Sequence, residues 1–176
     1  MGEHICFRRN ERLATVNPHW RGNPVVRGKF VNRQHRFRPG MGSVLKWRLS
    51  PNPQRKEKKS VKWSPKLNYL RSLDGVVGNS LIWLGHNSFF LQLARKRIMF
   101  DPVFGDIPFV KRQSDFPANP DIFTDIDYLL ISHDHFDHLD KQSVARLVKN
   151  NPGMKLFCGL GTGELIKGWF PELEVT

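Results

Sequence analysis

From residue 79 onward, short apolar runs alternate with turn-forming residues, which is the pattern of a small sheet. The runs "SLIWL", "FFLQLA" and "IMF" are separated by "GHNS" and "RKR", so we expect three short strands joined by tight turns. Pro102 follows the third strand and ends it, because proline cannot continue a central strand. Residues 105–125 are rich in Pro, Asp and Gly, and they are predicted to form a long loop.

Beyond this loop, strand and helix patterns alternate. "IDYLLIS" and "MKLFCG" indicate buried strands. Between them, Asp140 can cap a helix over residues 141–150, whose apolar residues fall on one face. A shorter helix over residues 162–170, capped by Thr162, and the start of one more strand complete the pattern. The predicted fold class is α/β (α+β), with a mixed sheet covered by helices.

The N-terminal region has a different pattern. Residues 1–66 are punctuated by six prolines and show no long run of period 2 or 3.6, although their aromatic residues are too frequent for a fully disordered tail. They carry 17 Lys and Arg against 3 Asp and Glu, whereas residues 67–176 carry 11 against 13. We assign residues 1–78 to a basic, aromatic N-terminal arm that drapes over a globular body formed by residues 79–176.

The basic arm could bind an anionic partner. Phosphates of nucleic acid and anionic lipid headgroups both attract such charge, and the alternative is a solvated arm without a partner. No apolar run approaches the roughly 18 to 20 residues of a membrane span, and the N-terminus has no apolar signal segment. Cys6 and Cys158 alone form no disulfide framework. We expect a cytoplasmic protein, with peripheral attachment to an anionic membrane as the alternative.

The stretch "SHDHFDHLD", residues 132–140, places four potential metal ligands in six positions directly after a strand. His133 and His135 are two residues apart, and on extended backbone they point the same way, so both imidazoles can reach one ion. Asp137 and His138 follow where the chain turns towards the helix, and they can face a second ion. Such ligands suit zinc, and less selectively iron or manganese. The alternative is a histidine-rich surface turn that binds no metal.

This stretch contains His-x-His-x-Asp-His, the signature of the metallo-β-lactamase superfamily. The preceding "WLGHNS" and "FDP" segments resemble the branch that includes N-acyl-phosphatidylethanolamine-hydrolysing phospholipase D and the L-ascorbate-6-phosphate lactonases. The resemblance implies His133 and His135 on a first zinc ion, and Asp137 and His138 on a second. It also implies that Asp137 orients the attacking water, a catalytic role.

Two further residues precede the motif. Asp101 matches an acidic position that supports the metal loop in such folds, and a carboxylate that orients a ligand histidine is physically sensible. The alternative is a turn-forming Asp before Pro102. His86, in "GHNS", would lie near the site in this branch, and its alternative role is a local hydrogen bond in a tight turn.

The resemblance also implies residues that this sequence lacks. The family's site takes a histidine, a bridging aspartate and a final histidine from the second half of an αββα sandwich. No histidine follows His138, and the arm's His4, His19 and His35 match no ligand position. We therefore expect the first half of the sandwich, with a sheet whose inner face would be a large apolar patch.

The function that this implies is a metal-dependent hydrolase of phosphodiester or phospholipid-like substrates, acting through a metal-bound hydroxide. One alternative is a sugar-phosphate lactonase of the same superfamily, and another is a truncated, catalytically inactive fragment. The expected partners are a small or lipid-like anionic substrate, an anionic membrane surface contacted by the arm, and a complementing second half or an oligomer. No nucleic-acid partner is expected, because residues 79–176 show no basic groove with aromatic platforms.

Overall fold

The chain divides into two compact units. The computed structural model describes residues 4–12, 17–31, 40–62, 65–107, 112 and 114–176, and the units are Met1–Trp63 and Ser64–Thr176. Residues before position 79 also pack in the second unit. Leu73 lies in the core of this unit and is only 4% exposed, and Leu70 forms a β-bridge with Ala118. The sequence pattern placed the change of character later, at residue 79.

The first unit has secondary structure that its sequence pattern did not reveal. Strands β1 (Cys6–Arg8), β2 (Asn23–Val26) and β3 (Lys29–Phe30) form a small antiparallel sheet. Two helices follow, α1 (Met41–Leu49) and α2 (Arg55–Ser60), and neither of them buries a residue. Among the described residues, no helix is both long enough and apolar enough to cross a membrane.

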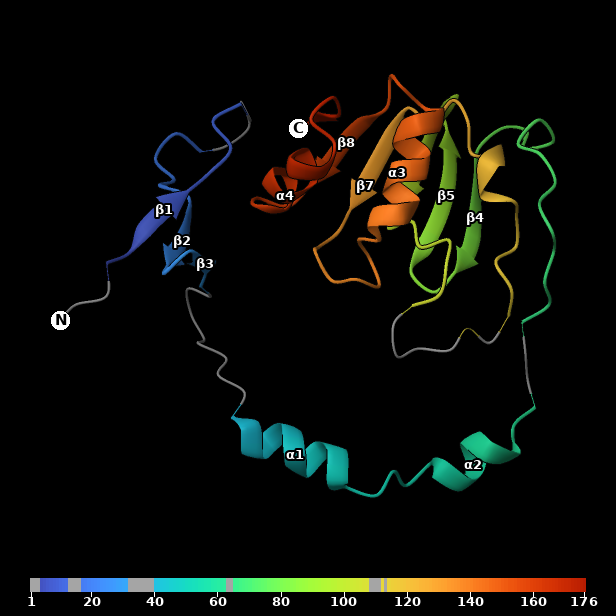
Figure 1. Cartoon of the computed structure of the whole chain (residues 1–176), viewed down its shortest axis with the longest axis horizontal. Coiled ribbons are helices and arrows are strands. Elements are labelled where there is room, and N and C mark those ends of the chain that lie inside the picture. Colours follow the sequence, from blue (N-terminus) through green and yellow to red (C-terminus); the bar gives the residue numbers. More distant parts are fainter. Residues whose placement is uncertain (1–3, 13–16, 32–39, 63–64, 108–111, 113) are drawn as a thin grey trace. The chain divides into compact units, whose positions relative to one another are not determined.

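The second unit is built on a mixed sheet, as predicted (Figure 1). Its strands lie in the order β4-β5-β6-β7-β8-β9, antiparallel from β4 to β6 and parallel from β6 to β9. The strands are β4 (Ser80–Gly85), β5 (Ser88–Leu93), β6 (Lys96–Phe100), β7 (Tyr128–Ile131), β8 (Lys155–Cys158) and β9 (Glu174–Val175). The helices are the 3-10 turn η1 (Pro120–Ile122), α3 (Lys141–Asn150) and α4 (Thr162–Trp169).

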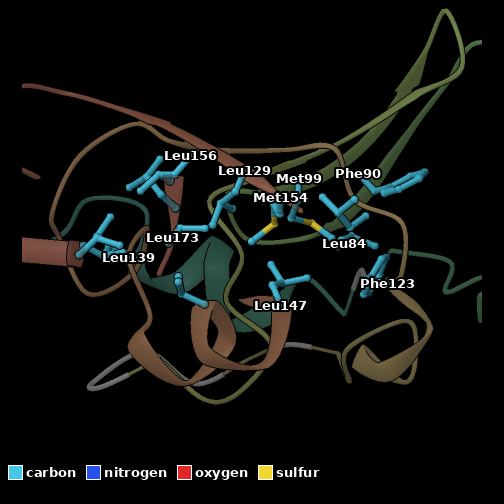
Figure 2. Packing of buried hydrophobic residues seen from close by; sticks show 14 of the residues in the cluster. Leu84, Phe90, Met99, Phe123, Leu129, Leu139, Leu147, Met154, Leu156 and Leu173 are labelled. Carbon is cyan, nitrogen blue, oxygen red and sulfur yellow. The ribbon is translucent and has the colours of Figure 1, made fainter. Parts of the chain in front are cut away.

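One face of this sheet packs against the helices and forms the core (Figure 2). Paired residues of neighbouring strands form a continuous row of buried side chains across the sheet: Phe90, Met99, Leu129 and Leu156. The helices bury Val144, Leu147 and Ile166 in the same cluster. Burial of this row holds the parallel strands β6, β7 and β8 side by side.

The sequence predicted the N-terminal cap of α3 correctly and that of α4 incorrectly. Asp140 caps α3, since its Oδ2 accepts a hydrogen bond of 2.9 Å from the backbone N–H of Ser143, and this prediction is confirmed. The prediction that Thr162 caps α4 is wrong. Gly161 occupies the cap position with φ of 88°, a conformation that glycine adopts without strain, so Thr162 is already the first helical residue.

The opposite face of the sheet is apolar, and its side chains are half-buried or exposed. The strand register places ten apolar side chains on it: Leu81, Trp83, Phe89, Leu91, Leu93, Ile98, Phe100, Tyr128, Leu130 and Phe157. Leu81 is 66% exposed and Trp83 is 53% exposed. We call this set the apolar face. It matches the expectation of a sheet with an unpaired inner face, and contiguous apolar patches of this kind mark interaction sites.

The two faces of β5 should differ in their contribution to stability. Phe90→Ala opens a cavity in the core and should lower the free energy of unfolding by about 3–5 kcal/mol. Phe89→Ala, one residue earlier on the apolar face, is the matched control and should cost less than half as much. Urea denaturation followed by circular dichroism measures both values. Equal losses would show that the apolar face is as well packed as the core.

The apolar face should also cause the 176-residue chain to self-associate, because water contacts so many of its large side chains. The double change Leu81→Lys and Trp83→Lys should shift the sedimentation profile towards monomer. Val77→Lys is a control, since Val77 is 84% exposed but lies outside the strands. A monomeric parent chain in analytical ultracentrifugation would contradict this prediction.

Candidate metal centre

Three segments that carry candidate ligands meet at one edge of the sheet. Strand β7 is parallel to β6, and β4 runs in the same direction because both β4 and β6 are antiparallel to β5. The carboxyl ends of β4, β6 and β7 therefore lie at the same edge. The β4–β5 turn carries His86, the end of β6 carries Asp101, and the loop after β7 carries the histidine cluster.

Asp101 is held firmly at this edge. Its backbone has φ of 39°, an uncommon conformation for a residue other than glycine, and its N–H donates to the Leu130 carbonyl at 3.0 Å. The buried hydroxyl of Ser88 donates to the Asp101 carbonyl at 2.7 Å and accepts from the Val103 N–H at 3.0 Å. These bonds define the turn that follows β6, so the carboxylate projects from a fixed backbone.

The Asp101 carboxylate contacts the histidine loop directly. Its Oδ1 accepts from the Ser132 backbone N–H at 2.8 Å, and its Oδ2 accepts from the Ser132 hydroxyl at 2.6 Å. His138 Nδ1 lies 2.8 Å from the same Oδ2. The sequence left open whether Asp101 only forms a turn or also supports the loop. In the structure it does both, and its predicted role towards a metal stays a prediction.

The loop after β7 gathers the three motif histidines. It closes with a turn in which the N–H groups of His138 and Leu139 donate to the His135 carbonyl at 2.9 and 2.7 Å. The His133 ring centroid lies 4.0 Å from that of His138 and 4.5 Å from that of His135. The three rings are therefore neighbours, although His135 is exposed and the other two are half-buried.

His86 reaches this loop from the β4–β5 turn. Its φ is 51°, and its carbonyl accepts a hydrogen bond of 2.9 Å from Trp83 Nε1. Its Nε2 donates to Asp137 Oδ2 at 3.2 Å. This hydrogen bond is the largest influence on that carboxyl, and it holds the pKa of Asp137 below that of a free aspartate. His86 thus contacts a predicted ligand as well as its own turn.

Two residues of the site were not identified from the sequence. Asn87 Nδ2 donates to His138 Nε2 at 3.0 Å. The Ser132 hydroxyl lies 2.9 Å from His133 Nδ1 and 3.2 Å from His138 Nδ1. Both residues are adjacent in sequence to predicted site residues, and that adjacency was the available signal. Asn and Ser are so common in turns that neither stands out without coordinates.

The imidazole and carboxylate groups of the loop are of the kinds that bind metal ions, but they do not all converge on one point. Among the residues that the structure describes, no group of three or more His, Cys, Asp or Glu side chains could by itself hold an ion. Asp137 Oδ2 lies 3.7 Å from His138 Nε2, so this carboxylate and imidazole approach each other. His138 presents Nδ1 to a carboxylate and Nε2 to the opposite side, the orientation usual for a histidine that binds a metal. Of the arm's histidines, His35 lies outside the described residues.

Comparisons with known proteins agree with this architecture. Residues 96–176 match the sequence profile of the β-lactamase superfamily domain. This part of the chain is similar to members of the β-lactamase superfamily. The chain is 28% identical over 160 residues to N-acyl-phosphatidylethanolamine-hydrolyzing phospholipase D 1 of Caenorhabditis elegans, a match that covers 82% of this chain and 45% of that protein. The family resemblance expected from the motif is confirmed.

Other proteins are also similar to parts of the chain. A metal-dependent hydrolase of Sulfolobus acidocaldarius is 36% identical over 78 residues, covering 44% of this chain and 31% of that protein. Among solved structures, the diiron β-hydroxylase CmlA of Streptomyces venezuelae aligns with a TM-score of 0.42 and 19% identity, covering 76% of this chain and 25% of CmlA. The chain thus spans less than half the length of these relatives.

Because His86 contacts Asp137, replacing His86 should change the pKa of Asp137 measurably. His86→Ala removes the hydrogen bond and should raise the pKa of Asp137 towards that of a free aspartate. A carboxyl whose pKa is lowered by folding stabilises the native state above its unfolded pKa, and this contribution is lost as pH falls through the folded pKa. The variant should therefore retain less of this contribution in mild acid.

The measurement is a titration of the Asp137 carboxyl carbon by NMR. His19→Ala, which alters an exposed histidine of the first unit, is the control. A pKa of Asp137 that is the same in the parent chain and in His86→Ala would show that the contact does not persist in solution.

Proposed function

We propose that the second unit supplies half of the active site of a zinc-dependent hydrolase acting on phosphodiester or phospholipid-like substrates. The observation that supports this most directly is the hydrogen bonding of His138. A carboxylate at 2.8 Å from Nδ1 directs Nε2 towards the side where Asp137 lies. Carboxylate, histidine and metal recur in this order in zinc enzymes.

The residues that would hold the metal are those of the loop after β7. His133 and His135 would serve a first ion, and Asp137 and His138 a second. A bound zinc ion lowers the pKa of a coordinated water to about 7 and polarises a phosphoryl oxygen. Asp137 can orient the attacking water with one carboxylate oxygen while His86 holds Oδ2. Iron and manganese can use the same donors, so zinc is part of the proposal.

The substrate class is supported by the relatives and by the first unit. The matched segment of the Caenorhabditis elegans phospholipase D is 160 residues long, so it extends beyond the 113 residues of the second unit into the first. Helix α1 exposes apolar side chains, including Met41 at 85% and Trp47 at 78%, and α2 contains Lys56, Lys58 and Lys59. Apolar and basic side chains close in sequence suit an anionic lipid surface.

The remaining ligands are proposed to come from a second sheet that packs on the apolar face. Catalytic zinc normally has three protein ligands and a water, and each predicted pair here supplies two. A second sheet from the complementing half would cover the apolar side chains and complete both ligand sets. The same arrangement implies that this chain, assayed without a complementing second half, hydrolyses substrate slowly.

Zinc affinity tests the proposed centre. Asp101→Asn removes the carboxylate that orients His138 and should weaken zinc binding by about 10- to 100-fold. His138→Ala removes a predicted ligand and should weaken it at least as much. Asp134→Asn, an exposed change in the same loop, is the control and should bind as the parent chain does. Competition with a fluorescent chelator measures all four affinities.

Hydrolysis by the zinc-loaded chain separates the substrate classes. N-acyl-phosphatidylethanolamine in vesicles and bis(4-nitrophenyl) phosphate are the substrates expected to turn over. A sugar-phosphate lactone should not be opened, and preferential opening of it would favour the lactonase alternative. The proposed metal centre fails if the parent chain binds no zinc, or if Asp134→Asn and Asp101→Asn weaken binding equally.

A further inference from the structure

We propose that Ser132 is a positioning residue that keeps the proton of neutral His133 on Nδ1, so that Nε2 of this histidine carries the free lone pair. The inference concerns the protonation of the metal-free loop, and it matters for catalysis only if the function proposed above is correct. The hydrogen bonds around the hydroxyl group of Ser132 determine where these protons lie.

The hydroxyl of Ser132 has one proton and two neighbours that compete for it. Oγ lies 2.6 Å from Asp101 Oδ2 and 2.9 Å from His133 Nδ1. An ionised carboxylate can only accept hydrogen bonds, so the contact with Asp101 uses the hydroxyl proton. If the proton pointed at His133 instead, lone pairs of Oγ and Oδ2 would face each other at 2.6 Å, which is electrostatically unfavourable.

With its proton committed to Asp101, Ser132 can only accept from His133. The 2.9 Å contact is then a hydrogen bond from His133 Nδ1–H to Oγ. In the neutral ring the second nitrogen, Nε2, has no proton and is an acceptor. The imidazole therefore presents its lone pair away from Ser132, which is the form in which a histidine binds a metal.

His138 reaches the same protonation state through a different partner. Its Nδ1 is 2.8 Å from Asp101 Oδ2 and 3.2 Å from Ser132 Oγ, so the carboxylate is the nearer acceptor of the Nδ1 proton. The amide of Asn87 donates to His138 Nε2 at 3.0 Å, and this bond requires a lone pair on Nε2. One proton arrangement thus satisfies every contact among Asp101, Ser132, His133, His138 and Asn87.

The consequence for metal binding is preorganisation of two ligands by one carboxylate. Asp101 acts on His138 directly and on His133 through Ser132. A free imidazole in water favours the proton on Nε2, so without Ser132 a metal would have to select the minor form of His133. Two of the predicted ligands would thus be oriented before an ion arrives, as buried carboxylates orient metal-binding histidines elsewhere.

The test reads the position of the proton directly. The metal-free chain is labelled with 15N in its histidines and observed in long-range 1H–15N correlation spectra at about pH 8.5, two units above the ordinary imidazole pKa. His133→Gln identifies the signals of His133 by their loss. In the parent chain both His133 and His138 should show a protonated Nδ1. In Ser132→Ala, His133 should move towards a protonated Nε2, while His138 should keep its pattern.

Retention of the His138 pattern distinguishes the proposed role from a general disturbance of the loop, which would change both rings. Ser132→Thr keeps the hydroxyl and should restore the pattern of His133, and Ser80→Ala, which loses only a local bond to the Val77 carbonyl, should leave it unchanged. A parent chain with its His133 proton on Nε2 would overturn the inference. So would a Ser132→Ala chain in which His133 does not change.

Zinc affinity provides a second measurement that separates this inference from the proposed function. Ser132→Ala should weaken zinc binding by about tenfold, at the low end of the range for partners of ligand histidines. If the tautomer changes as expected but the parent chain binds no zinc, the proposed function fails and the role of Ser132 stands. If zinc binds and neither the tautomer nor the affinity responds to Ser132→Ala, the role of Ser132 is refuted and the proposed function stands.

Discussion

The arrangement of the second unit depends on the buried row that crosses its sheet. Phe90, Met99, Leu129 and Leu156 occupy paired positions on successive strands and pack beneath α3. Their burial fixes which strands are neighbours and in which register, because a shift by one residue would turn each of these side chains to the other face. Parallel pairing of β6 with β7 then brings the ends of both strands to one edge, and the candidate centre lies there.

Asp101 connects the strand pairing of the sheet to the position of the histidine loop. It is the first residue after β6, its N–H is bonded to Leu130 of β7, and its carboxylate accepts hydrogen bonds from Ser132 and His138. The geometry of the histidine loop therefore depends on strand pairing several residues away. The left-handed backbone of Asp101 contributes to this, because it turns the side chain towards β7 while Pro102 leads the main chain away from the sheet.

The sequence predicted the elements that have a strong periodic pattern. The apolar run of β5 and the one-sided apolar pattern of α3 predicted these two elements, and Asp140 marked the start of α3. The strands of the first unit were missed because they are two to four residues long, and β2 contains Pro24. Ligand candidates were visible as a motif. Their hydrogen-bond partners Asn87 and Ser132 were not, because these contacts depend on strand pairing as well as on residue type.

Under the proposed function, the apolar face and the incomplete ligand sets have one physical origin. In a sandwich of two sheets, each sheet buries its inner face against the other, and a site at the shared edge draws ligands from both. A chain that contributes one sheet must therefore expose apolar side chains such as Leu81 and Trp83, and its predicted ligands come from one side only. The orientation of His138 and His133 is consistent with a site whose ligands are divided between two sheets. The imidazoles of the loop after β7 can be ordered within this unit, because Asn87, Asp101 and Ser132, which hold them, all follow strand ends at the same edge of one sheet.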